Sequence, residues 1–154
     1  MIQNAGAMPL LGARAHDYPG KTPQELFANI AGDGFQAMQL AFPKSFGVKY
    51  PLPEAFLEET AQAMERHHLH LAVIGCYIDP ALPDREAAKT QVDTFISALP
   101  AARFLNAGCV GTETTNLEKA GGDRKKAMPL LIDNVKRMAE AAEKWEVNVG
   151  IEPV

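Results

Sequence analysis

A carboxylate at the end of a predicted strand is the residue best placed to do chemistry in this sequence. β-Branched residues at positions 147, 149 and 151 lead up to Glu152, and Pro153 follows it. Such alternation predicts a strand, and proline marks its end because it cannot donate to a neighbouring strand. In α/β enzymes, metals and substrates bind at the carboxyl ends of parallel strands. Glu152 is therefore a candidate metal or substrate ligand, although a glutamate there can also be solvated or form a salt bridge at the rim.

Three other residues lie at or just after the ends of predicted strands and are expected on the same side. Glu113 could hydrogen-bond substrate hydroxyls or orient Glu152, and it could equally cap a turn among the neighbouring threonines. His16 could contact substrate or bind a metal, but a lone histidine beside an aspartate and a tyrosine is more often structural. Tyr77 could line the wall of the pocket. These positions make His16, Tyr77 and Glu113 candidate substrate-binding residues.

The remaining histidines and the cysteines fit structural roles. His67, His68 and His70 come at the end of a predicted helix, on the opposite face, where cations suit the helix carboxyl end. Cys76 and Cys109 lie far apart and form no C-x-x-C pair, so we expect two reduced, partly buried thiols.

Apolar strand-like runs alternate with amphipathic helical segments along the chain. The predicted strands are Leu10–Ala15, Phe35–Phe42, Leu69–Ile78, Arg103–Val110 and the terminal run ending at Glu152. A capping box at Thr22 with Pro23 after it starts the first helix, and Asp84 is the predicted N-cap of the third. The second helix runs from Pro53 to His67. The stripe from Met128 to Ala142 forms the last helix, with Pro129 in its first turn.

This alternation predicts an α/β fold with a parallel sheet, because each helix returns the chain to the same edge. A doubly wound sheet and part of a (β/α)8 barrel both fit the order. The sequence contains neither G-x-G-x-x-G nor G-x-x-x-x-G-K-[ST], which weakens nucleotide binding and favours the barrel. We expect strands 1 to 5 and helices 1 to 4, about four and a half β/α units, in one partial domain over 1–154.

Composition narrows the functional class. A length of 154 residues with 47% hydrophobic residues suits one soluble domain with a real core. The net charge of −4 does not favour nucleic-acid binding. No apolar run is long enough to span a bilayer, and the amino terminus lacks the features of a signal peptide, so a cytoplasmic location is expected.

Three segments carry a resemblance to a known family. They are Ile74–Pro80 after the third strand, Val110–Thr114 after the fourth, and Val149–Pro153. In their order and spacing they resemble the xylose isomerase-like TIM-barrel superfamily, in particular its sugar phosphate isomerases and epimerases. The resemblance covers essentially the whole chain but only the N-terminal half of such a barrel.

The resemblance implies a metal-dependent isomerase or epimerase of sugars or sugar phosphates, of the aldose–ketose or C3-epimerising type, acting through an enediolate. In that family a divalent metal (Mn, Mg, Co or Zn) is held by Glu, Asp, His and Glu. The first of these ligands matches Glu152, which would double as a catalytic acid or base. The others lie on strands six to eight, which this sequence does not contain. The metal would therefore be incompletely liganded here, and we expect a fragment of a longer protein.

Two alternatives stay open. The chain could be a non-catalytic half barrel whose exposed edges drive self-association into a homodimer. It could also be a zinc-dependent, AP-endonuclease-like phosphodiesterase of the same superfamily, although its acidic balance argues against this. Small sugars or sugar phosphates, rather than nucleic acids or membranes, are the expected partners, together with a second copy of the chain in a homodimer.

Overall fold

The computed structural model describes residues 9–154, in which five parallel strands form one sheet in the order β1-β2-β3-β4-β5. The strands are β1 (Gly12–Arg14), β2 (Ala37–Leu40), β3 (His70–Gly75), β4 (Cys109–Glu113) and β5 (Asn148–Glu152). Sequential order with parallel pairing throughout is the arrangement of a (β/α)8 barrel wall. The predicted α/β half barrel is confirmed.

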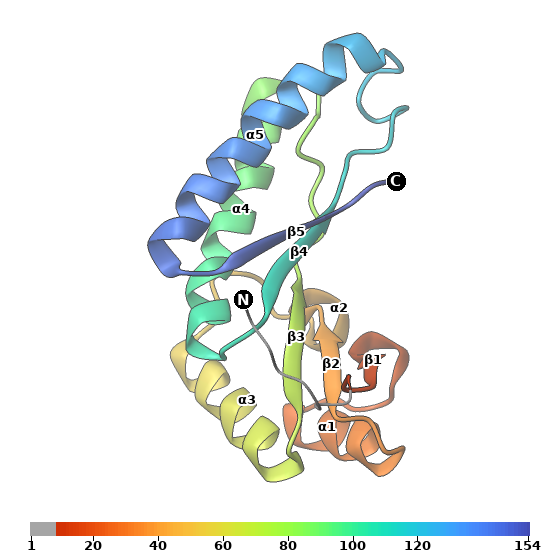
Figure 1. Cartoon of the computed structure of the whole chain (residues 1–154), viewed down its shortest axis with the longest axis vertical. Coiled ribbons are helices and arrows are strands. Elements are labelled where there is room, and N and C mark those ends of the chain that lie inside the picture. The colour runs from red at the N-terminus through yellow and green to blue at the C-terminus, as the bar shows by residue number, and fades with distance from the viewer. Residues whose placement is uncertain (1–8) are drawn as a thin grey trace.

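Four long helices connect successive strands. The helices are α1 (Pro23–Gly32), α3 (Glu54–His67), α4 (Arg85–Phe104) and α5 (Arg124–Trp145), with a short α2 (Phe42–Phe46) after β2 and a 3-10 turn, η1 (Ala15–Asp17), after β1. Helices α3, α4 and α5 run along one side of the sheet (Figure 1). The predicted domain over 1–154 stays a prediction, and its first eight residues lie outside the described part.

The helices begin where the sequence places capping side chains. The Thr22 hydroxyl accepts the N–H of Glu25 at 3.2 Å, and Pro23 occupies the first turn. The Asp84 carboxylate accepts two N–H groups at the start of α4, those of Glu86 and Ala87, each at 2.9 Å. These contacts satisfy N–H groups that have no partner within the helix.

The hydrophobic core lies between the sheet and its helices. Fully buried side chains from both layers pack there, among them Phe27, Met38, Ile74, Phe95 and Val110. Successive residues of a strand point to opposite faces, so the residues between these core positions point to the other, inner face. That face carries the functional candidates.

Three local expectations were wrong. The predicted fourth strand, Arg103–Val110, begins too early, because α4 continues to Phe104 and β4 starts only at Cys109. A short apolar run does not separate strand from helix by its pattern, and the alanines before Arg103 are buried on the helix. The prolines and the glycine between Phe42 and Pro53 predict a loop, but this segment begins with the short helix α2. Pro129 lies in the second turn of α5 because that helix starts at Arg124.

Candidate active site

Two glutamates stand side by side at the carboxyl ends of β4 and β5. Glu113 and Glu152 are direct register partners in the parallel pairing of these strands. Neighbouring strands lie about 4.8 Å apart, and paired residues point to the same face. The N–H of Thr114 donates to the carbonyl of Glu152 at 2.9 Å, which continues the pairing past the strand end. The fold thus presents a pair of carboxylates on one face.

A hollow of about 290 Å³ lies beside Glu152 on the inner face of the sheet, and Glu113 is not among the residues that border it. Its polar wall consists of Gln39, Tyr77 and Glu152, and two glycines, Gly111 and Gly150, form part of its floor. A Cβ at position 111 would come 2.9 Å from Cγ1 of Val73, so a larger residue there would have to displace that side chain. Because these two floor residues have no side chain, space remains for a ligand beside Glu152.

Tyr77 is held by a side chain from β2. Nε2 of Gln39 donates to the Tyr77 hydroxyl at 2.5 Å. Burial raises the pKa of Tyr77, and the negative charges of Glu113 and Glu152 raise it further. The phenol therefore keeps its proton at neutral pH, and that proton is available to an oxygen atom in the hollow.

Cationic side chains lie on the β1 side of Tyr77. Nζ of Lys44 stands 4.0 Å from the centre of the Tyr77 ring, a cation–π contact. Arg14, at the end of β1, donates to both carboxylate oxygens of Asp17, at 2.8 and 3.2 Å. This hydrogen bond lowers the pKa of Asp17, so its carboxylate stays charged. The site therefore has carboxylates at one end and cations at the other.

His16 follows β1 in η1 and is not among the residues that border the hollow. Burial lowers the pKa of His16, and the positive charges of Lys44 and Arg14 lower it further. Its Nδ1 is buried and has no hydrogen-bond partner within residues 9–154. His16 is thus a neutral imidazole at the edge of the cationic side.

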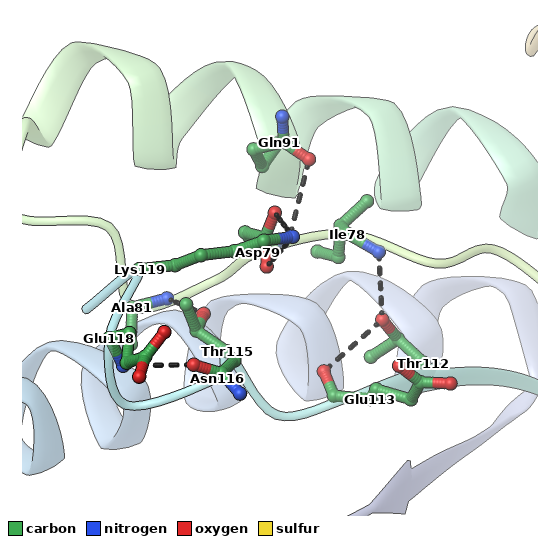
Figure 2. Close-up of polar contacts among 10 residues, drawn as sticks. All are labelled: Ile78, Asp79, Ala81, Gln91, Thr112, Glu113, Thr115, Asn116, Glu118 and Lys119. Carbon is green, nitrogen blue, oxygen red and sulfur yellow. Dashed lines mark hydrogen bonds and ion pairs between the residues drawn. The ribbon is translucent and has the colours of Figure 1, made fainter. Parts of the chain in front are cut away.

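A network of hydrogen bonds ties the loop after β3 to the loop after β4 (Figure 2). The Thr112 hydroxyl accepts the N–H of Ile78 at 3.1 Å, and the Thr115 hydroxyl accepts that of Ala81 at 2.7 Å. Lys119 forms an ion pair with Asp79 at 3.1 Å across the same loops. These contacts fix the chain next to Tyr77 and next to Glu113, and so hold the two residues in place relative to each other.

The fold brings three of the four predicted site residues together. Tyr77, Glu113 and Glu152 lie within electrostatic range of one another, whereas His16 lies on the cationic side. His70 is the first residue of β3, so the histidines at 67, 68 and 70 are at the opposite end of the sheet, as expected. Their structural role, and the site roles of the other four, stay predictions.

Sequence reasoning missed Arg14, Gln39 and Lys44. Gln39 left a signal, because it is a polar residue inside an otherwise apolar strand. Arg14 also left a signal, because it is a charged residue next to the last position of the predicted strand Leu10–Ala15. Lys44 left no signal, because its place over the Tyr77 ring depends on α2, which the sequence did not predict.

The donor set fits part of a divalent metal site. Carboxylate oxygens are the ligands that hard divalent cations prefer, and Glu113 and Glu152 offer them side by side. Residues 9–154 contain no group of three His, Cys, Asp or Glu side chains close enough to hold a metal together. Catalytic metal sites ordinarily use three or more protein ligands. These residues are therefore suited to contribute to a metal site, not to complete one.

Comparison with known proteins agrees with this fold. The family model described as xylose isomerase-like TIM barrel matches residues 27–154. The chain belongs to this family. The model covers most of the sequence, including β2 to β5 and both glutamates.

Solved structures of sugar epimerases share the architecture. A D-tagatose 3-epimerase-like protein superposes with a TM-score of 0.77 at 14% identity, over 93% of this chain and 52% of its own. The 3-keto-D-glucoside 4-epimerase YcjR from E. coli gives a TM-score of 0.72 at 13% identity, over 94% and 55%. The IolI protein, solved with a bound zinc atom, gives 0.68 at 14% identity, over 95% and 52%.

The chain spans about half the length of these solved structures. At such low identity the likeness concerns the fold alone. No curated protein matches the sequence. Within residues 9–154, no helix has the length and apolar character needed to cross a membrane.

Proposed function

We propose that this chain forms part of the active site of a metal-dependent isomerase or epimerase that acts on a small sugar or sugar phosphate. The observation that carries the proposal is the register pairing of Glu113 with Glu152, of which Glu152 borders an open hollow. Two carboxylates at the carboxyl ends of adjacent parallel strands suit the transfer of a proton to and from carbon. Membership of a family whose solved relatives include sugar epimerases supports the substrate class.

In this proposal each residue has a distinct task. Glu152 removes the proton from the carbon next to the sugar carbonyl, and Glu113 hydrogen-bonds a neighbouring hydroxyl or orients Glu152. Tyr77, held by Gln39, donates a hydrogen bond to a sugar oxygen. Proton return to the same carbon on the other face gives an epimer, and return to the adjacent carbon gives the aldose–ketose isomer.

A divalent metal, when bound, would stabilise the negative charge of the enediolate. Glu152 is its proposed ligand in this chain, with Glu113 next to it. Two carboxylates hold such an ion only weakly, so the remaining ligands would come from other residues of the assembled protein. That the chain is the N-terminal part of a longer, cytoplasmic protein stays a prediction.

The test compares Glu152→Gln with Glu140→Gln, an exposed glutamate of α5 that does not border the hollow. Ketoses and their phosphates are incubated with Mn, Mg, Co or Zn, and products are separated by chromatography. We expect Glu152→Gln to lower the rate by at least about 100-fold, the usual share of a general acid or base, and Glu140→Gln to leave it unchanged. Affinity for Mn²⁺ or Zn²⁺, measured by calorimetry, should also fall in Glu152→Gln.

Two results would contradict the proposal. One is full activity and full metal affinity in Glu152→Gln. The other is an inactive purified protein across the whole panel together with cleavage of DNA that carries an abasic site, which would support the phosphodiesterase alternative instead.

A further inference from the structure

Lys44 places a positive charge next to a residue of the hollow's wall, Tyr77, although Lys44 itself does not border the hollow. Its ammonium lies over the ring of Tyr77, whose hydroxyl is fixed by Gln39 in the wall of the hollow. Within residues 9–154 no carboxylate comes within ion-pair distance of Lys44, although six other ion pairs form there. Lys44 is exposed, and its charge helps to lower the pKa of Asp17, so Asp17 is a carboxylate near this cation even though the two form no direct ion pair.

Arg14 adds directed N–H groups on the same side. The guanidinium has five N–H groups, and Asp17 accepts two of them. The side chain of Arg14 is 59% exposed, so the remaining donors face open space. Because Asp17 fixes the plane of the guanidinium, those donors have a defined direction, as in arginine sites for carboxylate and phosphate.

The elements that carry these cations also hold unused polar atoms. Nδ1 of His16 and Oγ of Ser45 are buried without a hydrogen-bond partner in the described part of the chain. They belong to η1 and α2, two elements that pack against each other and that flank Lys44. Most buried polar atoms in proteins have a hydrogen-bond partner, so these two atoms are available to a bound water or ligand.

The charges of the site are separated across Tyr77. Glu113 and Glu152 lie on the β4–β5 side, and Lys44 and Arg14 lie on the β1–α2 side. Tyr77 senses both groups, since the two glutamates raise its pKa and Arg14 opposes that rise. A substrate with an anionic end would therefore adopt one orientation, with its anion away from Glu113 and Glu152 and toward Lys44 and the donors of Arg14 that Asp17 does not use.

We propose that the substrate of this site carries an anionic group, a phosphate ester or a carboxylate, which Lys44 and Arg14 bind on the β1–α2 side of the hollow. This inference rests on the proposed function for the position of the reacting carbon, which would lie toward Glu152. It goes beyond that function by naming the class of sugar and the residues that select it.

The experiment measures binding without turnover. Isothermal titration of the purified protein compares a neutral ketose, its phosphate ester and a sugar acid of the same length. The variants are Lys44→Gln, the rescue variant Lys44→Arg, and Lys49→Gln as a matched exposed lysine five residues on. We expect wild type to bind one anionic ligand at least about ten-fold more tightly than the neutral sugar, and salt to reduce the difference.

Lys44→Gln should lose about ten-fold in affinity for the anionic ligand and keep its affinity for the neutral sugar. Lys44→Arg and Lys49→Gln should keep the preference. A preference for the phosphate ester would identify phosphate as the anion, and a preference for the sugar acid would identify a carboxylate. Equal affinity for neutral and anionic sugars, or an unchanged preference in Lys44→Gln, would overturn the inference.

The same titrations separate this inference from the proposed reaction. If wild type prefers the anionic ligand but catalyses no epimerisation or isomerisation, the anion site stands and the reaction is wrong. If Glu152 is essential for turnover of neutral sugars and Lys44→Gln behaves as wild type, the reaction stands and the anion site is wrong.

Discussion

At the scale of single residues, Glu113 and Glu152 are candidate catalytic residues because of their position in the sheet and not because of their residue type. Each is an ordinary glutamate in a strand, and the protein has 19 acidic residues in all. Register pairing between β4 and β5 places these two next to each other, and Tyr77 responds to both charges. The pairing of these two glutamates is therefore a property of the sheet.

His16 should titrate below its ordinary pKa of 6.5. Burial, Lys44 and Arg14 all disfavour the imidazolium in the folded protein, and Asp17 only partly opposes them. In the unfolded chain these influences are gone, so the unfolded state binds the proton more tightly. The contribution of His16 to stability is then fully present above about pH 6.5 and is lost as the pH falls through the lower, folded pKa.

An NMR titration of the His16 ring resonances measures this pKa directly. We expect a midpoint below 6.5, and a smaller loss of stability between pH 7 and pH 5 in His16→Gln than in wild type. A midpoint above 6.5 would mean that Asp17 dominates the environment of the imidazole.

Sequence alone identified the residues that end strands, and it could do so because a parallel sheet gathers strand ends at one edge. Glu152, Glu113 and Tyr77 were found by this rule, although none of their roles has been tested. Lys44 could not be found, because its role depends on the cation–π contact made by a short helix.

At the scale of elements, the loops after β3 and β4 act as one unit because threonine hydroxyls join them. Thr112 is nearly fully buried and accepts the N–H of Ile78, while Asn134 of α5 donates to the carbonyl of Pro80 at 2.7 Å. The position of Tyr77 therefore depends on β4 and α5 as well as on its own strand.

Thr112→Val should destabilise the protein by about 1–3 kcal/mol. Valine has nearly the same shape but leaves the buried N–H of Ile78 without an acceptor. Urea unfolding measures the change, and Thr94→Val, on the exposed face of α4, is the control and should stay within about 0.5 kcal/mol of wild type. Equal stability of Thr112→Val and wild type would show that the hydroxyl does not join the loops.

Helix starts were predictable because capping is local. Thr22 and Asp84 make the hydrogen bonds to backbone N–H groups that their sequence positions imply. The start of β4 was not predictable, because the residues before Asn106 have an apolar pattern that suits a helix or a strand. Packing of α4 against the core decides between them, and that packing is not local.

At the scale of the whole molecule, one edge of the sheet is a surface through which the chain could pair with another chain. β5 forms an edge of the sheet, and Ile151 on it is 38% exposed. On α5 nearby, Met128 and Ile132 are 36% and 46% exposed. An exposed strand edge with apolar neighbours favours pairing with another chain or segment.

The purified chain should therefore have about twice its monomer mass of 16.7 kDa in solution. Ile151→Lys places a charge on the exposed edge and should shift the mass toward that of the monomer. Light scattering measures both. A wild-type mass of 16.7 kDa would contradict the prediction of a homodimer.

The central claim is that Glu152 moves a proton at the carbon next to a sugar carbonyl. The most direct measurement is NMR of the product formed in D₂O with Mg²⁺ or Zn²⁺, which shows whether deuterium has entered at that carbon. We predict deuterium at the epimerised or isomerised carbon with the wild-type protein, and its loss in Glu152→Gln. Product that forms without deuterium, or equal incorporation in Glu152→Gln, would contradict the claim.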